Sequence, residues 1–310
     1  MRLGVLDVGS NTVHLLVVDA HRGAEPTPQH SNKSVLRLAE VIDKRGGIAK
    51  SGADALVNAV REAKRRANDL ECDELLAFAT SAVRDAENGT AVLDRVQHET
   101  KVELTVLTGD DEARLTFLAV RRWQGWSAGR LLCLDIGGGS LELAVGDDED
   151  PQVALSVPLG AGRLTRERLD GDPPSKASVI ALREYVDGQL AKPATKLLAG
   201  GRPELAVCTS KTFRTLTRLA GAAPSSAGPR TRRVLTRNGL RQVTSFISRM
   251  ASADLAELEG VSPARAHQTL AGSIVAAAAM DALGVDELLQ CPWALREGVI
   301  LRRLDWLADQ

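Results

Sequence analysis

Two short segments rich in glycine and hydroxyl side chains each follow a buried, strand-like run that carries one aspartate. Gly9-Ser10-Asn11-Thr12 lies between the runs LGVLDV and VHLLVVDA, and Gly137-Gly138-Gly139-Ser140 lies between LLCLDI and LELAV. Closely spaced backbone N–H groups and hydroxyls are what a phosphate needs. Asp7 and Asp135, 128 residues apart, occupy equivalent places, where each could hold a Mg²⁺ that shares the phosphate oxygens. The spacing predicts two phosphate-binding hairpins.

Each segment also fits an ordinary tight turn, in which glycine supplies a positive φ and the aspartate only ends a strand. Neither segment is a dinucleotide fingerprint or a Walker A loop, because a strand rather than a helix follows the glycines and no GK[ST] is present. The occurrence of two copies favours the phosphate-binding interpretation over the simple turn.

Asp135 and Glu142 form a candidate metal pair. Glu142 lies three residues beyond Gly139 on the outgoing strand, so two carboxylates flank one oxyanion-binding loop. Glu142 also alternates with Leu141 and Leu143, which equally fits a carboxylate on the outward face of a strand. The pattern leaves both interpretations open.

Two more residues could act on a bound phosphate. Glu112 stands with Asp110 and Asp111 at the start of a predicted helix over 110–123, and acids there complement the helix dipole. The pattern favours that structural explanation, although a base that orients an attacking water is also expected near a metal-bound phosphate. Arg84 follows a predicted strand and could clamp a phosphate through two nitrogens or simply pair with a neighbouring acid.

The charge distribution predicts a local site for a polyanion. The chain has 39 basic and 40 acidic residues, and its net charge of −1 excludes a protein that holds nucleic acid through its overall field. From Leu205 to Ala253, however, no acid occurs beside nine basic residues, and arginine suits phosphate chains especially well. A solvated basic helix with a loop is the alternative. The expected polyanion track consists chiefly of Arg230, Arg232, Arg233, Arg237 and Arg241.

Composition excludes several classes of protein. Hydrophobic residues make up 44% and charged residues 25%, as in a soluble globular protein. Aromatic residues make up only 3%, too few to stack nucleic-acid bases. The apolar stretch 273–282 is far shorter than the roughly 20 residues of a membrane span, so a core helix is expected there. We expect neither a nucleic-acid nor a membrane partner.

The chain is expected to be cytoplasmic. Asp7 interrupts the N-terminal apolar run before an export signal could form. The four cysteines are widely separated and suit buried thiols in a reducing compartment. The five histidines are interpreted as structural or surface residues, since no two stand at metal-ligand spacing, and no nucleophilic hydrolase motif stands out.

The order of elements predicts a duplicated α/β protein. Each hairpin opens a half in which strands and helices alternate, with strands expected at 74–79, 103–107, 152–157 and 204–208 and helices at 56–70, 91–100, 110–123 and 178–190. The chain after Lys211 is expected to be helical. These halves predict two domains, 1–126 and 127–310, with a cleft between them. Two roles are open for the last helix, 294–306: it packs back on the first domain, or it forms the surface of a homodimer.

Six motifs together give the chain a family resemblance. They read MRLGVLDVGSNTVHLLV, FATSAVRDAEN, LTGDDEARLTFLAV, LDIGGGSLELAVG, PLGAGRLT and ALREGVIL. In this order they resemble the exopolyphosphatase / guanosine pentaphosphate phosphohydrolase (Ppx/GppA) family, in its short two-domain form. The resemblance implies two ribonuclease-H-like domains of the actin, sugar kinase and heat-shock ATPase superfamily, which flank a phosphate-binding cleft.

The resemblance also implies roles for individual residues. It makes Glu112 the catalytic glutamate, against the structural explanation, and makes Asp135 and Glu142 the metal-binding acids. Phosphate contacts are implied for Ser10, Asn11, Thr12, Arg84, Gly137, Gly138, Gly139 and Ser140. Asp7 remains a further metal candidate from its equivalence to Asp135. Mg²⁺ is the expected cofactor, with Mn²⁺ as a substitute.

Two positions depart from the family pattern. Leu141 stands where the family usually has threonine, which bears on how the second loop holds phosphate. Thr209-Ser210-Lys211-Thr212 stands where a glycine-rich turn is usual, which puts contacts to a base or ribose in doubt.

The expected function is hydrolysis of the terminal phosphate of inorganic polyphosphate. Hydrolysis of guanosine pentaphosphate by the same residues is the nearest alternative. A phosphotransferase or kinase of the same superfamily and a catalytically silent polyphosphate sensor rank lower, because no acceptor site stands out and because Glu112, Asp135 and Glu142 occur together.

Overall fold

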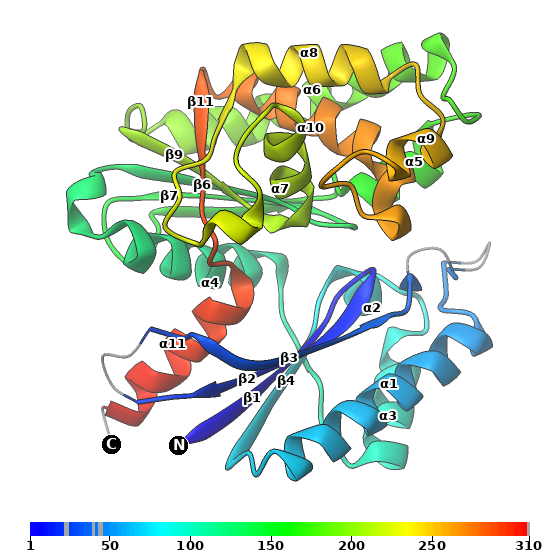
Figure 1. Cartoon of the computed structure of the whole chain (residues 1–310), viewed down its shortest axis with the longest axis vertical. Coiled ribbons are helices and arrows are strands. Elements are labelled where there is room, and N and C mark those ends of the chain that lie inside the picture. The colour runs from blue at the N-terminus through cyan, green and yellow to red at the C-terminus, as the bar shows by residue number, and fades with distance from the viewer. Residues whose placement is uncertain (22–24, 39–40, 43–45, 309–310) are drawn as a thin grey trace. The chain divides into compact units, whose positions relative to one another are not determined.

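The computed structural model describes residues 1–21, 25–38, 41–42 and 46–308. The chain divides into two compact units, unit 1 with Met1–Leu115 and Leu295–Gln310, and unit 2 with Thr116–Ala294. Each unit has one β-sheet with helices packed on it (Figure 1). The units divide inside a helix, α4 (Gly109–Gln124), whereas the sequence prediction placed the domain boundary at 126/127.

The sheet of unit 1 has five strands in the order β3-β2-β1-β4-β5. The first three form an antiparallel meander, and β4 and β5 continue in parallel. The strands are β1 (Arg2–Val8), β2 (Thr12–Asp19), β3 (Pro28–Val35), β4 (Glu74–Ala79) and β5 (Thr105–Val106), and the helices are α1 (Lys50–Asp69), α2 (Ser81–Arg84), α3 (Gly89–Thr100) and α11 (Leu295–Ala308).

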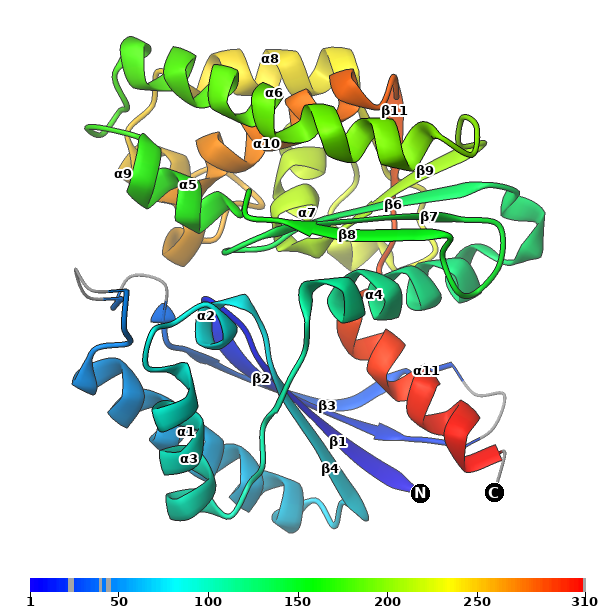
Figure 2. The ribbon, with the colours of Figure 1, turned by 180° about the vertical axis from the view of Figure 1, so that it is seen from behind.

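Both faces of this sheet are covered, which explains why its central strands are apolar on both sides. Leu6 and Val8 of β1 pack toward α1 and α3, whereas Leu3 and Val5 face the other way, into a cluster with Ile300 of α11. Figure 2 shows α11 on the opposite side of the sheet from α1 and α3. The last helix therefore packs back on the sheet of unit 1.

The sheet of unit 2 has six strands in the order β10-β11-β9-β6-β7-β8. The strands are β6 (Leu131–Ile136), β7 (Leu141–Gly146), β8 (Val153–Val157), β9 (Leu205–Thr209), β10 (Val234–Thr236) and β11 (Glu287–Gln290). The helices are α5 (Ala161–Arg168), α6 (Lys176–Leu198), α7 (Ser210–Leu219), α8 (Arg237–Ile247), α9 (Ser252–Ala256) and α10 (Thr269–Ala282), with short 3₁₀ turns at Trp126–Ala128, Ser225–Ala227 and Pro263–Gln268. α6 and α10 pack on one face of the sheet (Figure 1).

The two sheets share one topology. In each, an antiparallel meander of three strands is followed by a strand that pairs in parallel with the first, β4 with β1 and β9 with β6. β5 and β11 then extend the sheets in parallel beyond β4 and β9. The predicted duplication of an α/β half is confirmed.

The predicted core helix at 273–282 is also confirmed. It forms most of α10, in which nearly every side chain is buried, as expected of a helix that is apolar on all sides. Among the described residues, no helix combines the length and apolar character that crossing a bilayer requires.

One local prediction is wrong, and two others have the wrong bounds. The strand expected at 103–107 contains only Thr105–Val106. The chain after Lys211 includes the strands β10 and β11, whose three and four residues are too short to show a period of two. The helix expected at 178–190 runs from Lys176 to Leu198, through Pro193, although proline usually ends or kinks a helix.

Candidate active site

The first loop, residues 9–12, is closed by its own backbone. The Gly9 amide donates to the Thr12 carbonyl at 3.0 Å, and the amides of Leu36 and Arg37 both donate to the Asn11 carbonyl at 3.0 Å. The Ser10 hydroxyl lies 3.2 Å from the hydroxyl of Ser81, at the start of α2. Ser10 and Asn11 are buried, so the loop is held rigidly between β1 and β2.

The second loop, residues 137–140, is closed in the same way. The Gly137 amide donates to the Ser140 carbonyl at 2.9 Å, which is the bond from Gly9 to Thr12 shifted by 128 residues. The start of α5 supports the loop further, because the amides of Ala161 and Arg163 donate to the carbonyls of Gly137 and Gly138. The two hairpins are therefore alike in hydrogen bonding as well as in sequence.

Gly160 lets the chain before α5 approach the second loop closely. A Cβ atom at this position would lie 2.2 Å from the Gly139 carbonyl carbon and 2.4 Å from the Ser140 nitrogen. Only glycine fits without displacing backbone. The segment PLGAGRLT is thus part of the support of the second loop.

Asp135 and Glu142 lie directly opposite each other on β6 and β7. Cross-strand partners share a face of the sheet, and this face is the one away from α6 and α10, since Leu134 and Leu141 belong to the core cluster on the other side. Glu142 is only 6% exposed, and its Oε1 accepts a hydrogen bond of 2.9 Å from the hydroxyl of Ser156. Glu142 therefore lies on the face away from this core, as alternation indicated, but it is shielded from solvent.

Four polar residues form a row across the sheet of unit 2. Thr209, at the end of β9, lies opposite Asp135, and Ser156 on β8 lies opposite Glu142. Among the described residues, no group of three or more histidine, cysteine, aspartate or glutamate side chains could hold a metal ion. Mg²⁺ commonly uses one or two carboxylates and takes its remaining ligands from water and substrate phosphates. The facing pair of carboxylates fits that ion.

In unit 1 the structure brings together two predicted site residues, Arg84 and Glu112. A guanidinium nitrogen of Arg84 forms an ion pair with the Glu112 carboxylate and also donates to the Leu107 carbonyl at 3.0 Å. Burial acts to lower the pKa of Arg84, but the carboxylates of Glu112 and Asp85 outweigh it and raise that pKa above its usual value. These carboxylates therefore favour the charged form of the Arg84 guanidinium.

Glu112 differs from the acids that precede it. Asp110 and Asp111 are exposed in the first turn of α4, as acids that complement a helix dipole would be. Glu112 is only 7% exposed. The structural explanation accounts for the first two acids and does not account for a buried carboxylate held by an arginine.

Asp7 has different neighbours from its counterpart Asp135. Its cross-strand partner is His14, and a nitrogen of Arg296 lies 4.0 Å from its carboxylate. The Arg296 guanidinium also contacts the His14 ring. The nearby positive charge of Arg296 disfavours binding of a metal cation at Asp7. These contacts therefore do not support Asp7 as a metal ligand, and that role stays a prediction.

The predicted polyanion track is not uniform. Arg233 is only 6% exposed and donates to the carbonyls of Ala223, Pro224, Gly228 and Thr231, so it fastens a loop. The Arg230 guanidinium lies 4.9 Å from the centre of the Trp123 ring. Arg232 is exposed.

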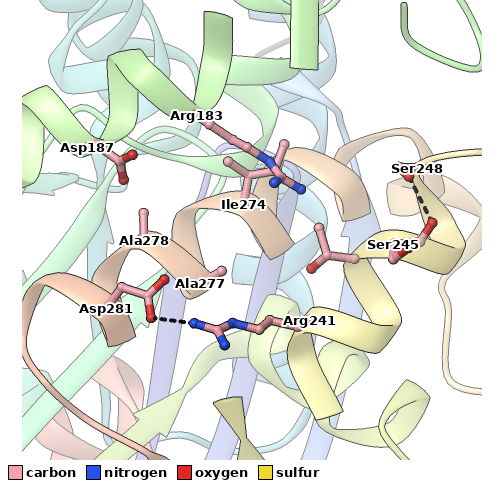
Figure 3. A pocket seen from close by; sticks show the side chains of 10 residues that line it. Arg183, Asp187, Arg241, Ser245, Ser248, Ile274, Ala277, Ala278 and Asp281 are labelled. Carbon is pink, nitrogen blue, oxygen red and sulfur yellow. Dashed lines mark hydrogen bonds and ion pairs between the residues drawn. The ribbon is translucent and has the colours of Figure 1, made fainter. Parts of the chain in front are cut away.

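The remaining two track residues, Arg237 and Arg241, pair with an acid that is distant in sequence. Each has a nitrogen 3.4 Å from the Asp281 carboxylate of α10. Arg241 also lines a pocket of about 460 Å³ between α6, α8 and α10, where Figure 3 shows it turned toward Asp281. Part of the basic charge of this stretch is thus balanced within unit 2.

Comparison with known proteins places the chain in a family. The model of the Ppx/GppA phosphatase family matches residues 16–306. The chain belongs to the Ppx/GppA phosphatase family. "Exopolyphosphatase 1" of Mycobacterium tuberculosis is 63% identical over 309 residues, covering 100% of this chain and 90% of that protein. "Exopolyphosphatase 1" of Mycobacterium leprae is 61% identical, covering 100% of this chain and 91% of that protein.

Solved Ppx/GppA structures share the fold. An exopolyphosphatase from Cytophaga hutchinsonii matches with a TM-score of 0.89 at 23% identity, over 99% of this chain and 98% of that one. The Ppx/GppA family member from Aquifex aeolicus matches with a TM-score of 0.81 at 23% identity, over 100% and 99%. The resemblance to the Ppx/GppA family and the prediction of an α/β fold with two β-sheets are confirmed.

Four residues that contact predicted site residues of this Ppx/GppA chain have no role that the sequence predicts. Gly160 and Arg296 lie within motifs of the family resemblance, which was the available signal. Ser156 and Thr209 could not be found that way, since only strand register places them beside Glu142 and Asp135.

Proposed function

We propose that this chain is an exopolyphosphatase, a phosphoanhydride hydrolase that removes terminal orthophosphate from inorganic polyphosphate. The observation that carries the proposal is the 63% identity over the whole chain to proteins named Exopolyphosphatase 1. Relatives of such similarity share their folded core and, as a rule, the chemistry of their site. The facing carboxylates on β6 and β7 supply an independent physical argument.

Asp135 and Glu142 would hold the metal ion. Mg²⁺, or Mn²⁺ in its place, neutralises charge on the phosphate oxygens when it is bound. Ser156 holds the Glu142 carboxylate in place through its 2.9 Å hydrogen bond. The amides and the Ser140 hydroxyl of the second loop would donate hydrogen bonds to the phosphate, and the first loop stays a predicted phosphate contact.

Glu112 would orient the attacking water and accept its proton. The water oxygen forms a bond to the terminal phosphorus, and the bond from that phosphorus to the bridging oxygen breaks. The products are orthophosphate and a polyphosphate that is shorter by one phosphate unit. Arg84, now paired with Glu112, is the cation that would bond the terminal phosphate, and a phosphate competing for Arg84 would release the carboxylate to act as a base.

The test is phosphate release by the purified protein with Mg²⁺. Long polyphosphate, tripolyphosphate, guanosine pentaphosphate and ATP are offered in parallel, and Glu112→Gln is the matched control because it keeps the size of the side chain and removes its basicity. We expect the fastest release from polyphosphate and a loss of about 10²-fold or more in kcat for Glu112→Gln.

Two outcomes contradict the proposal. Faster release from guanosine pentaphosphate than from polyphosphate would make the chain a guanosine pentaphosphate hydrolase, the other activity expected of this family. No release from any of the four substrates would remove the hydrolase assignment.

A further inference from the structure

A small basic pocket lies at the start of α7 in unit 2, and it has no assigned role. Its volume is about 90 Å³. The residues that line it are Lys211, Arg214, Arg218, Ala223, Pro224, Ser225, Arg233, Glu259, Gly260 and Gln290. We call it the α7 pocket.

The cations of the α7 pocket follow one face of a helix. Lys211, Arg214 and Arg218 are spaced three and four residues apart on α7, the spacing that aligns side chains along a helix. At 1.5 Å of rise per residue they extend over about 10 Å. The Arg218 nitrogen lies 2.5 Å from the Glu259 carboxylate, which is the single acid among the lining residues. The pocket is therefore net positive.

Two buried nitrogen atoms of this cationic face have no hydrogen-bond acceptor among the described residues. The Nε atoms of Arg214 and Arg218 are buried, and neither has a hydrogen-bond partner among the described residues. A buried donor without an acceptor costs about 1–3 kcal/mol. The net positive lining of the pocket points to an anionic ligand, whose charge would offset that of the two arginines.

The size and lining of the pocket specify which anion fits. Pockets for drug-sized ligands, a class that includes nucleotides, are about 300–1,000 Å³, several times larger than 90 Å³. Of the described residues that line the pocket, none is aromatic. A single phosphoryl group fits both its volume and its charge.

The side of the pocket that faces α7 is held by hydrogen bonds and close packing. Arg233, whose guanidinium donates to the carbonyls of Ala223 and Pro224, fixes the loop that faces α7. Gly260 lies so close to Arg218 that an added Cβ would come within 2.5 Å of the arginine Cγ. Contacts within the protein thus hold this wall of the pocket in place, and a wall that is ordered in advance lowers the entropic cost of binding.

The position of α7 connects the pocket to the proposed metal site. α7 begins directly after Thr209, and Thr209 lies opposite Asp135 on the neighbouring strand. Both stand at the carboxyl ends of parallel strands, where α/β sheets bind ligands. A chain whose terminal phosphate lies beside Asp135 would reach Lys211 first and Arg218 last.

We infer that the cationic face of α7 is a subsite for internal phosphoryl groups of bound polyphosphate, with the α7 pocket taking one of them. This inference rests on the proposed function. It replaces Arg230–Arg241 by Lys211, Arg214 and Arg218 as the residues that carry the chain away from the terminal phosphate.

The test measures binding separately from catalysis. In the Glu112→Gln background, the affinity for long polyphosphate and for pyrophosphate is titrated by calorimetry at several salt concentrations, for the parent and for Lys211→Gln. We expect Lys211→Gln to lower the affinity for long polyphosphate about five- to tenfold and the affinity for pyrophosphate by less than twofold. The slope of log affinity against log salt concentration should fall in magnitude by about one, as for any lost phosphate contact.

Matched variants keep the test sharp. Arg183→Gln removes an exposed charge from α6 in the pocket of Figure 3 and should leave the affinity for long polyphosphate and the salt slope unchanged. Arg214→Gln provides a second variant on α7 and should repeat the effect of Lys211→Gln. Folding of each variant is checked by its thermal midpoint.

Three results would overturn the subsite. The first is an equal loss of affinity for long polyphosphate and for pyrophosphate. The second is an unchanged salt slope in both α7 variants. The third is a larger loss of affinity for long polyphosphate in Arg241→Gln than in Lys211→Gln. Failure of wild-type protein to release phosphate would contradict the proposed function instead, and the titration would still report whether α7 binds the chain.

Discussion

At the scale of single residues, the most informative contrast is between two aspartates in equivalent places. Asp135 faces Glu142 across the strands, whereas Asp7 faces His14 and lies near Arg296. The duplicated hairpin has therefore become a pair of carboxylates in unit 2 and an ion pair in unit 1. One metal ion in unit 2, rather than one in each unit, is what these neighbours favour.

Metal binding to unit 2 can be measured without turnover. A ligand that binds only the folded state at 100 times its Kd stabilises that state by about 2.7 kcal/mol. We expect saturating Mg²⁺ to raise the thermal midpoint of the wild type by several degrees and to leave Asp135→Asn unchanged. Asp7→Asn is the matched control and should keep the Mg²⁺ response. A response lost in Asp7→Asn and kept in Asp135→Asn would reverse the assignment.

Ser210 carries backbone strain at the junction of β9 and α7. Its φ is +83°, in the left-handed region that favours glycine. Ser210→Gly should therefore stabilise the protein by about 1 kcal/mol, read from the urea midpoint at unchanged m-value.

The control for Ser210→Gly is a serine in an ordinary helix. Ser245, exposed within α8, should lose about 0.5–1 kcal/mol on replacement by glycine, because glycine has the greater conformational freedom to lose. Destabilisation of similar size at both positions would show that the φ of Ser210 costs nothing.

At the scale of elements, the second loop depends on the segment before α5. Gly160→Ala would force a Cβ into the backbone of Gly139 and Ser140, so we expect the loop to shift and phosphate release to fall at least tenfold, since a misplacement of about 1 Å can cost 10²-fold. Stopped or coupled phosphate assays give kcat and KM for the variant.

Gly188→Ala separates the loop effect from a general effect of alanine. A Cβ at Gly188, within α6, meets nothing within 4 Å. Alanine there should keep full activity and stabilise the helix by about 1 kcal/mol. Full activity in Gly160→Ala would show that the loop tolerates displacement or that its geometry does not matter to the reaction.

At the scale of the whole molecule, unit 1 is discontinuous, since α11 returns from the end of the chain to its sheet. Ile300 is fully buried against Leu3, Val5 and Phe78. Ile300→Ala should therefore cost about 2–5 kcal/mol of unfolding free energy. Denaturant unfolding measures the loss.

Ile180 provides the matched control, because the same side chain is 57% exposed on α6. Ile180→Ala should change the unfolding free energy by no more than about 0.5 kcal/mol. A cost for Ile300→Ala no larger than that of Ile180→Ala would mean that α11 contributes little to unit 1. The prediction of a homodimer is separate, and sizing in solution tests it.

Local sequence pattern is enough to predict many of the strands and turns of this protein. The two hairpins, the duplication and the buried α10 follow from apolar runs, glycine positions and period, and those are properties of neighbouring residues. The same patterns left the orientation of Glu142 open, and they favoured a helix-dipole role for Glu112 without predicting that its side chain is buried. The side on which a polar residue lies depends on distant chain segments.

Only the tertiary structure decided which of the candidate residues meet. Strand register set Asp135 against Glu142 and Thr209, and the fold of unit 1 brought Arg84 of α2 to Glu112 of α4. Arg233 looked like a surface cation in sequence and proved to fasten a loop through its backbone carbonyls. A residue's type specifies the bonds it can make, but its partners come from segments tens to hundreds of residues away, which local sequence does not specify.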